Sequence, residues 1–424
     1  MDRRSLIAKA LAHRRPLLIV LALFVFFYGM YLNIGLSLAE TSAFKEMDIL
    51  FGADTPRVID DIATFSADHH RTSVHPLYVL LVNPWGCFVK KLLHSKIAAA
   101  VAINSFFGAY AVCLALVFFL LLSGSLIDSA ILSCIFGFSM SQLFFSSVPE
   151  TSSLATCSLI ITYIIFLVAI QRKRPYPVLW VIAGILTLGV TTTNFAQTLI
   201  CFIVTLLSVH RKEKDLRLFA MIRPMMFAIF ITALFSIIQK MAYPSSRLFF
   251  TPAAYREEIN FLSLFIIRRP IAVLHQLAKH FMLVNVIAPL PDLLAIRESR
   301  FPLVTFENSW NYSIAGWVGL VAWVCALAAG IARAIRDRQK MNLFFVGISL
   351  CFFFNILLHS IYNGGSGRIE VFLYTGNCTF PLIILLGNYT ISKKLFTRTL
   401  SVALLLLIAF NNISVMRQLL VIYK

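Results

Sequence analysis

Long apolar runs recur along the whole sequence and are separated by short polar or basic segments. Many of these runs are about 20 residues long, the length with which an α-helix crosses the hydrocarbon core of a bilayer. The strands of a membrane β-barrel would instead appear as alternating segments of about ten residues. We therefore predict an all-α polytopic membrane protein with about eleven transmembrane helices. The expected spans are about 17–38, 97–122, 127–147, 152–170, two short helices within 178–209, 218–239, 313–334, 341–362, 372–390 and 399–416.

The apolar stretch 178–209 has a basic cluster on each side, "QRKR" before it and "HRKEK" after it. Because such clusters mark cytoplasmic loops, both ends of the stretch are expected on the same side of the membrane. A single crossing would put them on opposite sides. The sequence therefore predicts two short helices that turn at "TTTNF" (191–195).

The chain is strongly basic, with 37 Lys and Arg against 19 Asp and Glu and a formal net charge of +18. The basic residues form short clusters between apolar runs, as they do on cytoplasmic loops. We interpret this charge as a sign of topology and of contact with anionic lipid, and not as a nucleic-acid surface. With the N-terminus in the cytoplasm, 14 of the 19 carboxylates fall on the external side. Most of them lie in external loop 1 (39–96) or in a second long external segment (240–312), both parts of a single transmembrane domain over 1–424.

Cysteines and nucleotide motifs offer no sign of a cofactor. The eight cysteines are scattered without paired spacing and lie mostly inside apolar runs, which indicates small core residues and not zinc ligands or a disulfide framework. The sequence contains no Walker A loop and no dinucleotide fingerprint, so ATP- and NAD-driven functions lack their main support.

External loop 1 contains a helix-start pattern, "ADTPRVIDDIATF". Asp54 can cap the helix and Pro56 suits its first turn. An apolar face at helical spacing follows, formed by Val58, Ile59, Ile62 and Phe65. The helix is amphipathic and too short to cross a bilayer, so we expect it to lie along the membrane surface.

A carboxylate held at the membrane surface can act as a general base toward an acceptor hydroxyl. Asp54 is the first candidate for this role and Asp48, in "KEMDILFG", is its nearest rival. Asp60 and Asp61 lie further along the same helix, and we interpret them as part of its solvated face.

The segment 258–290 is also amphipathic and places Arg268 and Arg269, followed by further cations, beside apolar surface. Two interpretations remain open. The cations anchor the segment to the phosphates of the bilayer, or they form a wall for a lipid-linked phosphate substrate.

An Asp that opens a surface helix after the first span, followed some 20 residues later by "HPLY", resembles the membrane-embedded GT-C-fold glycosyltransferases. The resemblance is to the branch that contains the protein O-mannosyltransferases and the lipid A aminoarabinose transferases. The matching positions are Asp54 in "GADTPRVIDD" and His75 in "VHPLYVLL", although Thr55 replaces the usual acidic residue and only one Pro follows His75. "SVPETSSLA" and "GRIEVFLYTGNCTF" resemble later external loops and place Glu150, Glu370 and Tyr374 on the active side.

The resemblance implies an inverting transferase that takes a sugar from a polyprenyl-phosphate donor at the external, periplasmic face of a bacterial inner membrane. Asp54 would be the base, and the acceptor would be a glycan, a lipid or a protein. The implied donor-phosphate residues are Arg71, His75, Arg268 and Arg269, and the implied cavity residues are Tyr78, Glu150, Glu370 and Tyr374. A monophosphate leaving group can be stabilised by Arg and His without a metal, so a divalent metal is expected only with a diphosphate donor.

Other classes of function remain open. An O-antigen ligase or polymerase shares the location and the lipid-linked donor, and would use the Arg pair of the 240–312 segment. A lipid-linked-oligosaccharide flippase or transporter would place ionisable groups inside its spans, whereas here they concentrate in the external loops. A membrane scaffold without activity would leave the acid-rich first loop unexplained.

Overall fold

The structure is a computed structural model that describes residues 14–209, 218–262, 265–295, 299–336, 342–362, 371–391 and 395–424. Helices account for nearly all of the regular structure in these ranges. Among the described residues, eight helices are long and apolar enough to cross a membrane, or up to nine if one bent pair forms a single span. The prediction of an all-α polytopic membrane protein is thus confirmed, and the number of crossings stays a prediction.

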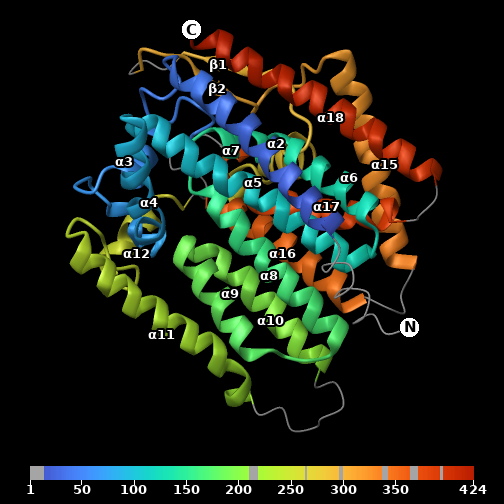
Figure 1. The fold of residues 1–424 in the computed structure, drawn as a ribbon, viewed down its shortest axis with the longest axis horizontal. Helices are drawn as coiled ribbons and strands as arrows, with labels where there is room; N and C mark the ends of the chain where they lie inside the picture. The colour runs from blue at the N-terminus through green and yellow to red at the C-terminus, as the bar shows by residue number, and fades with distance from the viewer. Residues whose placement is uncertain are drawn as a thin grey trace.

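The long apolar helices are α2 (Arg14–Ala39), α5 (Lys96–Ser123), α8 (Ser152–Arg172), α10 (Phe195–Val209, which follows η2, Thr192–Asn194), α11 (Leu218–Ala242), α15 (Ile314–Arg336), α16 (Asn342–Ile361) and α18 (Leu395–Ile422). Shorter elements are α3 (Thr55–Ala63), η1 (His70–Ser73), α4 (Tyr78–Leu93), α9 (Pro177–Val190), α12 (Pro252–Ile259), α13 (Phe265–Arg268), α14 (Pro270–Lys279), η3 (His280–Val284), η4 (Phe372–Tyr374) and α17 (Gly376–Thr390). The strands β1 (Asp292–Leu294) and β2 (Leu303–Thr305) pair antiparallel. Figure 1 shows α8, α9, α10 and α16 grouped as a bundle, with α3, α4 and α12 gathered at one side of it.

The structure contains two helix breaks in segments for which the sequence made a prediction. The predicted break within 178–209 is present, because α9 ends at Val190 and α10 begins at Phe195. The segment expected as one span over 127–147 is instead α6 (Leu126–Phe138) and α7 (Met140–Ser147), bent by 63°. The backbone N–H groups of Met140 and Ser141 donate to the carbonyls of Val286 and Asn285, so the loop after η3 satisfies the donors that the bend exposes.

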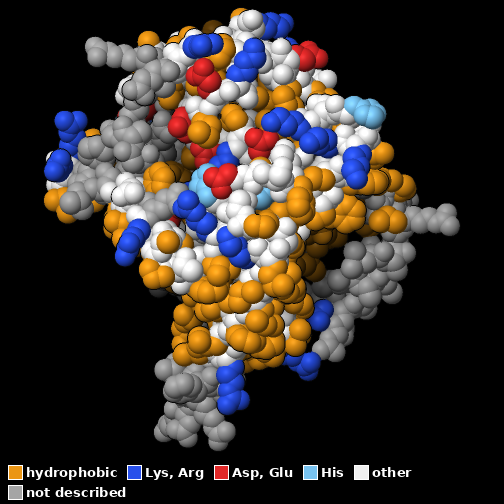
Figure 2. All heavy atoms as spheres, turned by 90° about the vertical axis from the view of Figure 1, so that its left-hand side faces the viewer, with side chains coloured by type: hydrophobic (Ala, Val, Ile, Leu, Met, Phe, Trp, Pro, Cys, Tyr) orange, Lys and Arg blue, Asp and Glu red, His pale blue; other side chains and the backbone are white. Residues whose placement is uncertain are grey.

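On one side of the molecule, charged and apolar side chains occupy different areas (Figure 2). Figure 2 shows acidic, basic and histidine side chains concentrated in its upper half, and below them a broad hydrophobic area almost without charge. Large side chains of α11 are exposed, among them Met226, Phe227 and Phe230. Such a surface suits contact with lipid tails. The charged loops lie at one end of this apolar bundle (Figure 2).

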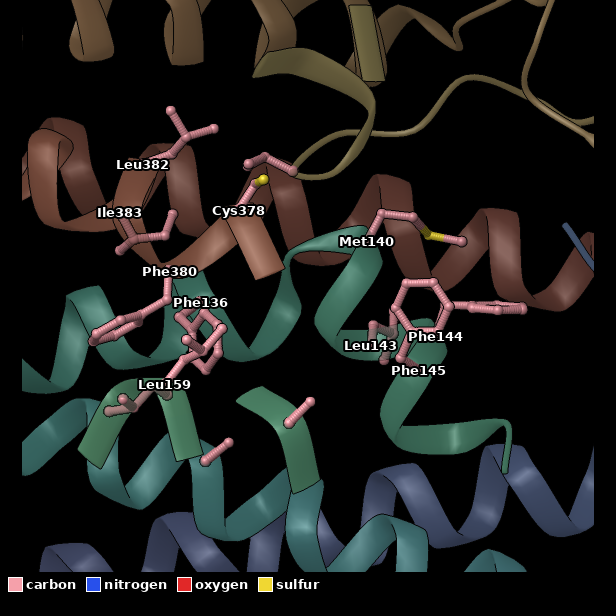
Figure 3. Packing of buried hydrophobic residues seen from close by; sticks show 14 of the residues in the cluster. Phe136, Met140, Leu143, Phe144, Phe145, Leu159, Cys378, Phe380, Leu382 and Ile383 are labelled. Atoms are coloured by element: carbon pink, nitrogen blue, oxygen red, sulfur yellow. The ribbon is translucent and has the colours of Figure 1, made fainter. Parts of the chain in front are cut away.

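Part of the core lies where α6, α7, α8 and α17 meet (Figure 3). Phe136 of α6 packs against Phe380 of α17 with ring centroids 5.2 Å apart. Phe144 of α7 contacts Phe372, the first residue of η4, at 5.8 Å. Because lipid tails are as apolar as these side chains, close packing and not transfer out of water holds the helices together.

Within loop 1, α3 and α4 approach each other closely. A Cβ atom added at Gly86 of α4 would overlap the backbone carbonyl of Ile62 in α3. Only glycine permits this spacing, so Gly86 determines how near α3 lies to α4.

Gly86→Ala is therefore expected to displace α3 and to lower thermal stability in detergent. A backbone carbonyl cannot move aside as a flexible side chain would, and overpacking of this kind costs about 1–3 kcal/mol. Gly29→Ala on α2 is the matched control, because a Cβ added there meets no atom within 4 Å. Equal unfolding temperatures for both variants would contradict the role of Gly86.

Candidate functional site

A cavity of about 1220 Å³ opens beside α3 at the charged end of the bundle. Its lining comes from loop 1, the turn between α7 and α8, η2, α12, the end of α16, and the η4–α17 segment. Figure 2 shows acidic, basic and histidine side chains lying close together on this side of the molecule. Six of the residues predicted from the sequence line the cavity: Asp48, Asp54, Arg71, His75, Glu150 and Tyr374.

A tight turn before α3 brings Asp48 and Asp54 to this cavity. The N–H of Asp48 donates to the carbonyl of Ala53 at 3.1 Å, and Asp48, Phe51 and Gly52 all have positive φ angles. The turn is anchored to β2, since Phe51 donates to the carbonyl of Val304 and Val304 donates to that of Ile49. Both carboxylates are thus held on one rigid piece of backbone.

Asp54 occupies the N-cap position of α3, as predicted, but its side chain does not cap the helix. Its Oδ2 accepts instead from Nε and Nη2 of Arg57, at 3.0 and 2.9 Å. The Asp54 side chain is 36% exposed, whereas that of Arg57 is only 11% exposed. The largely buried Arg57 therefore orients Asp54, and the Asp54 carboxylate stays accessible from the cavity.

Arg57 is a central residue that the sequence analysis did not single out. Besides Asp54, its Nη1 donates to Oδ2 of Asp61 at 2.8 Å. Burial lowers the pKa of Arg57, but the carboxylates of Asp54, Asp61 and Glu150 outweigh it and the pKa ends above its usual value. The spacing of Arg57 from Asp54 and Asp61, three and four residues, was the signal that could have identified it.

The interpretation of Asp61 as part of a solvated helix face is wrong. Asp61 is buried, and its Oδ1 lies 2.7 Å from Nδ1 of His69, which is also fully buried. Asn83 of α4 donates to the Asp61 backbone carbonyl as well. Asp60, by contrast, pairs with Lys96 at 2.8 Å with both side chains substantially exposed. The buried chain His69–Asp61–Arg57–Asp54 thus joins the interior of loop 1 to the cavity.

Asp61→Asn is expected to destabilise the protein by about 3–5 kcal/mol, because it leaves a buried guanidinium and a buried histidine short of a charged partner. Asp60→Asn is the matched control one residue away, and loss of its exposed ion pair costs about 0–1 kcal/mol. Thermal unfolding of both variants in the same detergent measures the difference. Similar unfolding temperatures would show that the buried chain does not stabilise loop 1.

Glu150 faces the same cavity from the turn between α7 and α8. Its Oε1 accepts from the N–H and the hydroxyl of Thr151, whereas its buried Oε2 has no hydrogen-bond partner in the described part of the chain. Burial raises the pKa of the Glu150 carboxyl, and the positive charge of Arg57 acts against that shift. Burial and the nearby charge of Asp54 likewise raise the pKa of Asp48. The carboxyl groups of Asp48 and Glu150 therefore bind protons more readily than free carboxyl groups do.

Arg71 also lines the cavity and already holds an anion. Its Nη1 donates to Oε1 of Glu258, on α12, at 2.6 Å, and the Tyr362 hydroxyl donates to Oε2 of the same carboxylate at 2.6 Å. The Arg71 guanidinium also lies over the ring of Phe261, 5.3 Å from its centroid. Two donors from distant parts of the chain thus converge on one carboxylate.

Other predicted residues lie elsewhere. Arg268 and Arg269 are exposed, at the end of α13 and before α14, and do not line the cavity. Tyr78 is buried at the start of α4, with its ring centroid 6.2 Å from that of His75, and is not among the lining residues either. Glu370 falls outside the described residues.

The cavity also contains residues that sequence reasoning missed, namely Tyr362, His359 and Asn377. The His359 ring stacks on that of Tyr374 at 4.1 Å, and Asn377 accepts from Asn194 at 3.0 Å. Across the ranges that the structure describes, no three His, Cys, Asp or Glu side chains are grouped so that they could hold a metal ion.

No protein-family model matches the sequence, and no curated protein matches it either. The resemblance to GT-C glycosyltransferases therefore stays a prediction that rests on the short motifs around Asp54 and His75.

Proposed function

We propose that this protein is a GT-C-type glycosyltransferase that transfers a sugar from a polyprenyl-phosphate donor to an acceptor hydroxyl. The observation that supports the proposal is the composition of one cavity, in which carboxylates gathered around Arg57 share the space with Arg71. The cavity lies beside long apolar helices. That arrangement suits a substrate with a charged head and an isoprenoid tail.

In the proposed reaction Asp54 removes the proton of the acceptor hydroxyl. The acceptor oxygen then forms a bond to the anomeric carbon while the bond from that carbon to the phosphate oxygen breaks. The electron pair leaves with the polyprenyl phosphate, and a single displacement inverts the configuration. A permanent cation such as Arg71 can stabilise the developing charge of the phosphate.

The donor is already activated by its phosphate link, so transfer requires no nucleotide. We place the reaction at the external face, which in a bacterial inner membrane is the periplasmic face, because the acid-rich segments are predicted there from the flanking basic clusters. The acceptor class, whether glycan, lipid or protein, is left to experiment.

The test is to reconstitute the purified protein in vesicles with polyprenyl-phosphate hexoses and candidate acceptors. We expect release of free polyprenyl phosphate together with a product of inverted anomeric configuration. Movement of the intact donor lipid across the bilayer without its consumption would instead indicate a flippase. A covalent glycosyl-enzyme would contradict the single displacement.

A further inference from the structure

His75 is held rigidly at the edge of the cavity. The backbone N–H of Leu77 donates to the carbonyl of Gly189 at 2.6 Å, and that of Thr192 donates to the carbonyl of Val74 at 3.0 Å. Between these two contacts, Nδ1 of His75 lies 2.7 Å from the carbonyl oxygen of Val190. The carbonyl of Val190 is the nearer partner of Nδ1, and the hydroxyl of Thr191 lies 3.4 Å from the same nitrogen, so the ring orientation is set mainly by the backbone.

This contact determines the tautomer of His75. A carbonyl oxygen can only accept, so Nδ1 must carry the proton of the hydrogen bond. In the neutral ring the other nitrogen, Nε2, then carries a lone pair and can only accept. Burial, followed by the charges of Arg57 and Arg71, lowers the pKa of His75 to about 3, which keeps the ring neutral near pH 7.

His359 presents a second nitrogen of the same kind. Its Nδ1 lies 3.3 Å from the carbonyl oxygen of Tyr362, which again assigns the proton to Nδ1. The residue is 3% exposed and lines the cavity, yet its Nε2 has no hydrogen-bond partner among the described residues. A buried acceptor without a partner costs about 1–3 kcal/mol, so a ligand that donates to it gains affinity.

A donor faces the same space. The side-chain oxygen of Asn377 accepts from Asn194, which identifies its amide nitrogen as the remaining polar group. Within the described part of the chain that nitrogen donates no hydrogen bond to protein, and Asn377 lines the cavity. Two acceptors and a donor around an aromatic pair match a molecule with several hydroxyl groups.

We propose that Nε2 of His75 and Nε2 of His359 accept hydrogen bonds from hydroxyl groups of a carbohydrate bound in the cavity. A phosphate oxygen is itself an acceptor and gains nothing from such a nitrogen, so His75 recognises the sugar in place of the phosphate contact predicted from the sequence. The phosphate is then left to Arg71. This inference rests on the proposed transferase function, and the sugar can belong to the donor or to the acceptor.

The experiment measures binding, so it does not depend on turnover. Three probes are used with the detergent-purified protein: polyprenyl phosphate alone, its mannosyl and glucosyl forms, and a methyl hexoside added after saturation with polyprenyl phosphate. The variants are His75→Phe, His75→Gln, His75→Lys and His359→Gln, and His94→Phe is the control because His94 is exposed outside the cavity.

We expect His75→Phe to weaken binding of the sugar-bearing lipids by about three- to tenfold, because one neutral hydrogen bond is lost. Binding of polyprenyl phosphate alone should stay as in the wild type. His75→Gln should recover much of this loss, because its amide oxygen can accept, and His75→Lys should not. Since His359→Gln keeps an acceptor, it should change each affinity by no more than about threefold. A loss confined to the methyl hexoside would assign the sugar to the acceptor.

Two results would overturn the inference. Equal weakening of all lipids by His75→Phe, with recovery by His75→Lys, would make His75 a phosphate ligand. No change for any probe would mean that His75 binds neither group. Either result leaves the transferase proposal standing as long as the wild type releases polyprenyl phosphate from the glycosylated donor.

Discussion

Replacing Asp54 with Asn is expected to lower the rate of sugar transfer by about 10²–10⁴-fold, the usual contribution of a general base. The Asn side chain keeps the size of Asp and an oxygen that can accept from Arg57, but it cannot take a proton from the acceptor hydroxyl. Donor binding should change little, since Asp54 is assigned to the acceptor. The measurement is the rate of polyprenyl phosphate release at saturating donor and acceptor.

Two controls make this result specific. Asp48→Asn tests the rival base on the same turn, and a larger loss there would transfer the role to Asp48. Asp60→Asn, with its exposed ion pair to Lys96, should leave transfer unchanged. If Asp54→Asn retains full activity, the chemistry does not run through this carboxylate, as expected for an O-antigen ligase type of enzyme.

The helical framework is predictable because the membrane imposes a simple rule, about 20 apolar residues per crossing with basic residues on one side. The same rule predicts the break at 191–195, where two basic flanks exclude a single crossing. This rule does not predict the bend at Ser139. No Pro stands there, and the bend depends on carbonyls of residues 285 and 286, more than 140 positions away.

Within loop 1 the sequence carried more information than the pattern analysis used. The spacing that joins Val58 and Ile62 on an apolar face also places Asp61 on that face. A buried carboxylate needs charged or donating partners, and Arg57 and His69 lie within eight residues of it. Phe65, expected on the same face, lies beyond the end of α3 and is 59% exposed.

The other half of the site is not predictable from one sequence. Glu258 meets Arg71 across 187 residues, and Asn377 meets Asn194 across 183. Local periodicity carries no information on such contacts. For the same reason the sequence could not show that Arg268 and Arg269 lie away from the cavity. Only the three-dimensional structure shows it.

Glu258→Gln is expected to tighten binding of the polyprenyl-phosphate donor by up to about tenfold. In the structure the Glu258 carboxylate takes the donors of Arg71 and Tyr362, which a phosphate would otherwise occupy. A neutral amide competes less well for a guanidinium, since hydrogen bonds to charged groups contribute about 1.5–3 kcal/mol. Glu40→Gln, an exposed carboxylate after α2, should leave affinity unchanged.

Arg71→Gln provides the opposite change and should weaken donor binding by roughly 10–100-fold, since it removes a charged partner of the phosphate. The decisive measurement is the double variant. If Glu258 acts only by occupying Arg71, then Glu258→Gln has no effect once Arg71 is absent, and the two changes are not additive. Additive effects would mean that Glu258 influences the donor independently, for example by attaching α12 through Tyr362. Non-additive effects would instead mean that Glu258 and the phosphate compete for the Arg71 guanidinium, so that α12 must release Arg71 in every turnover.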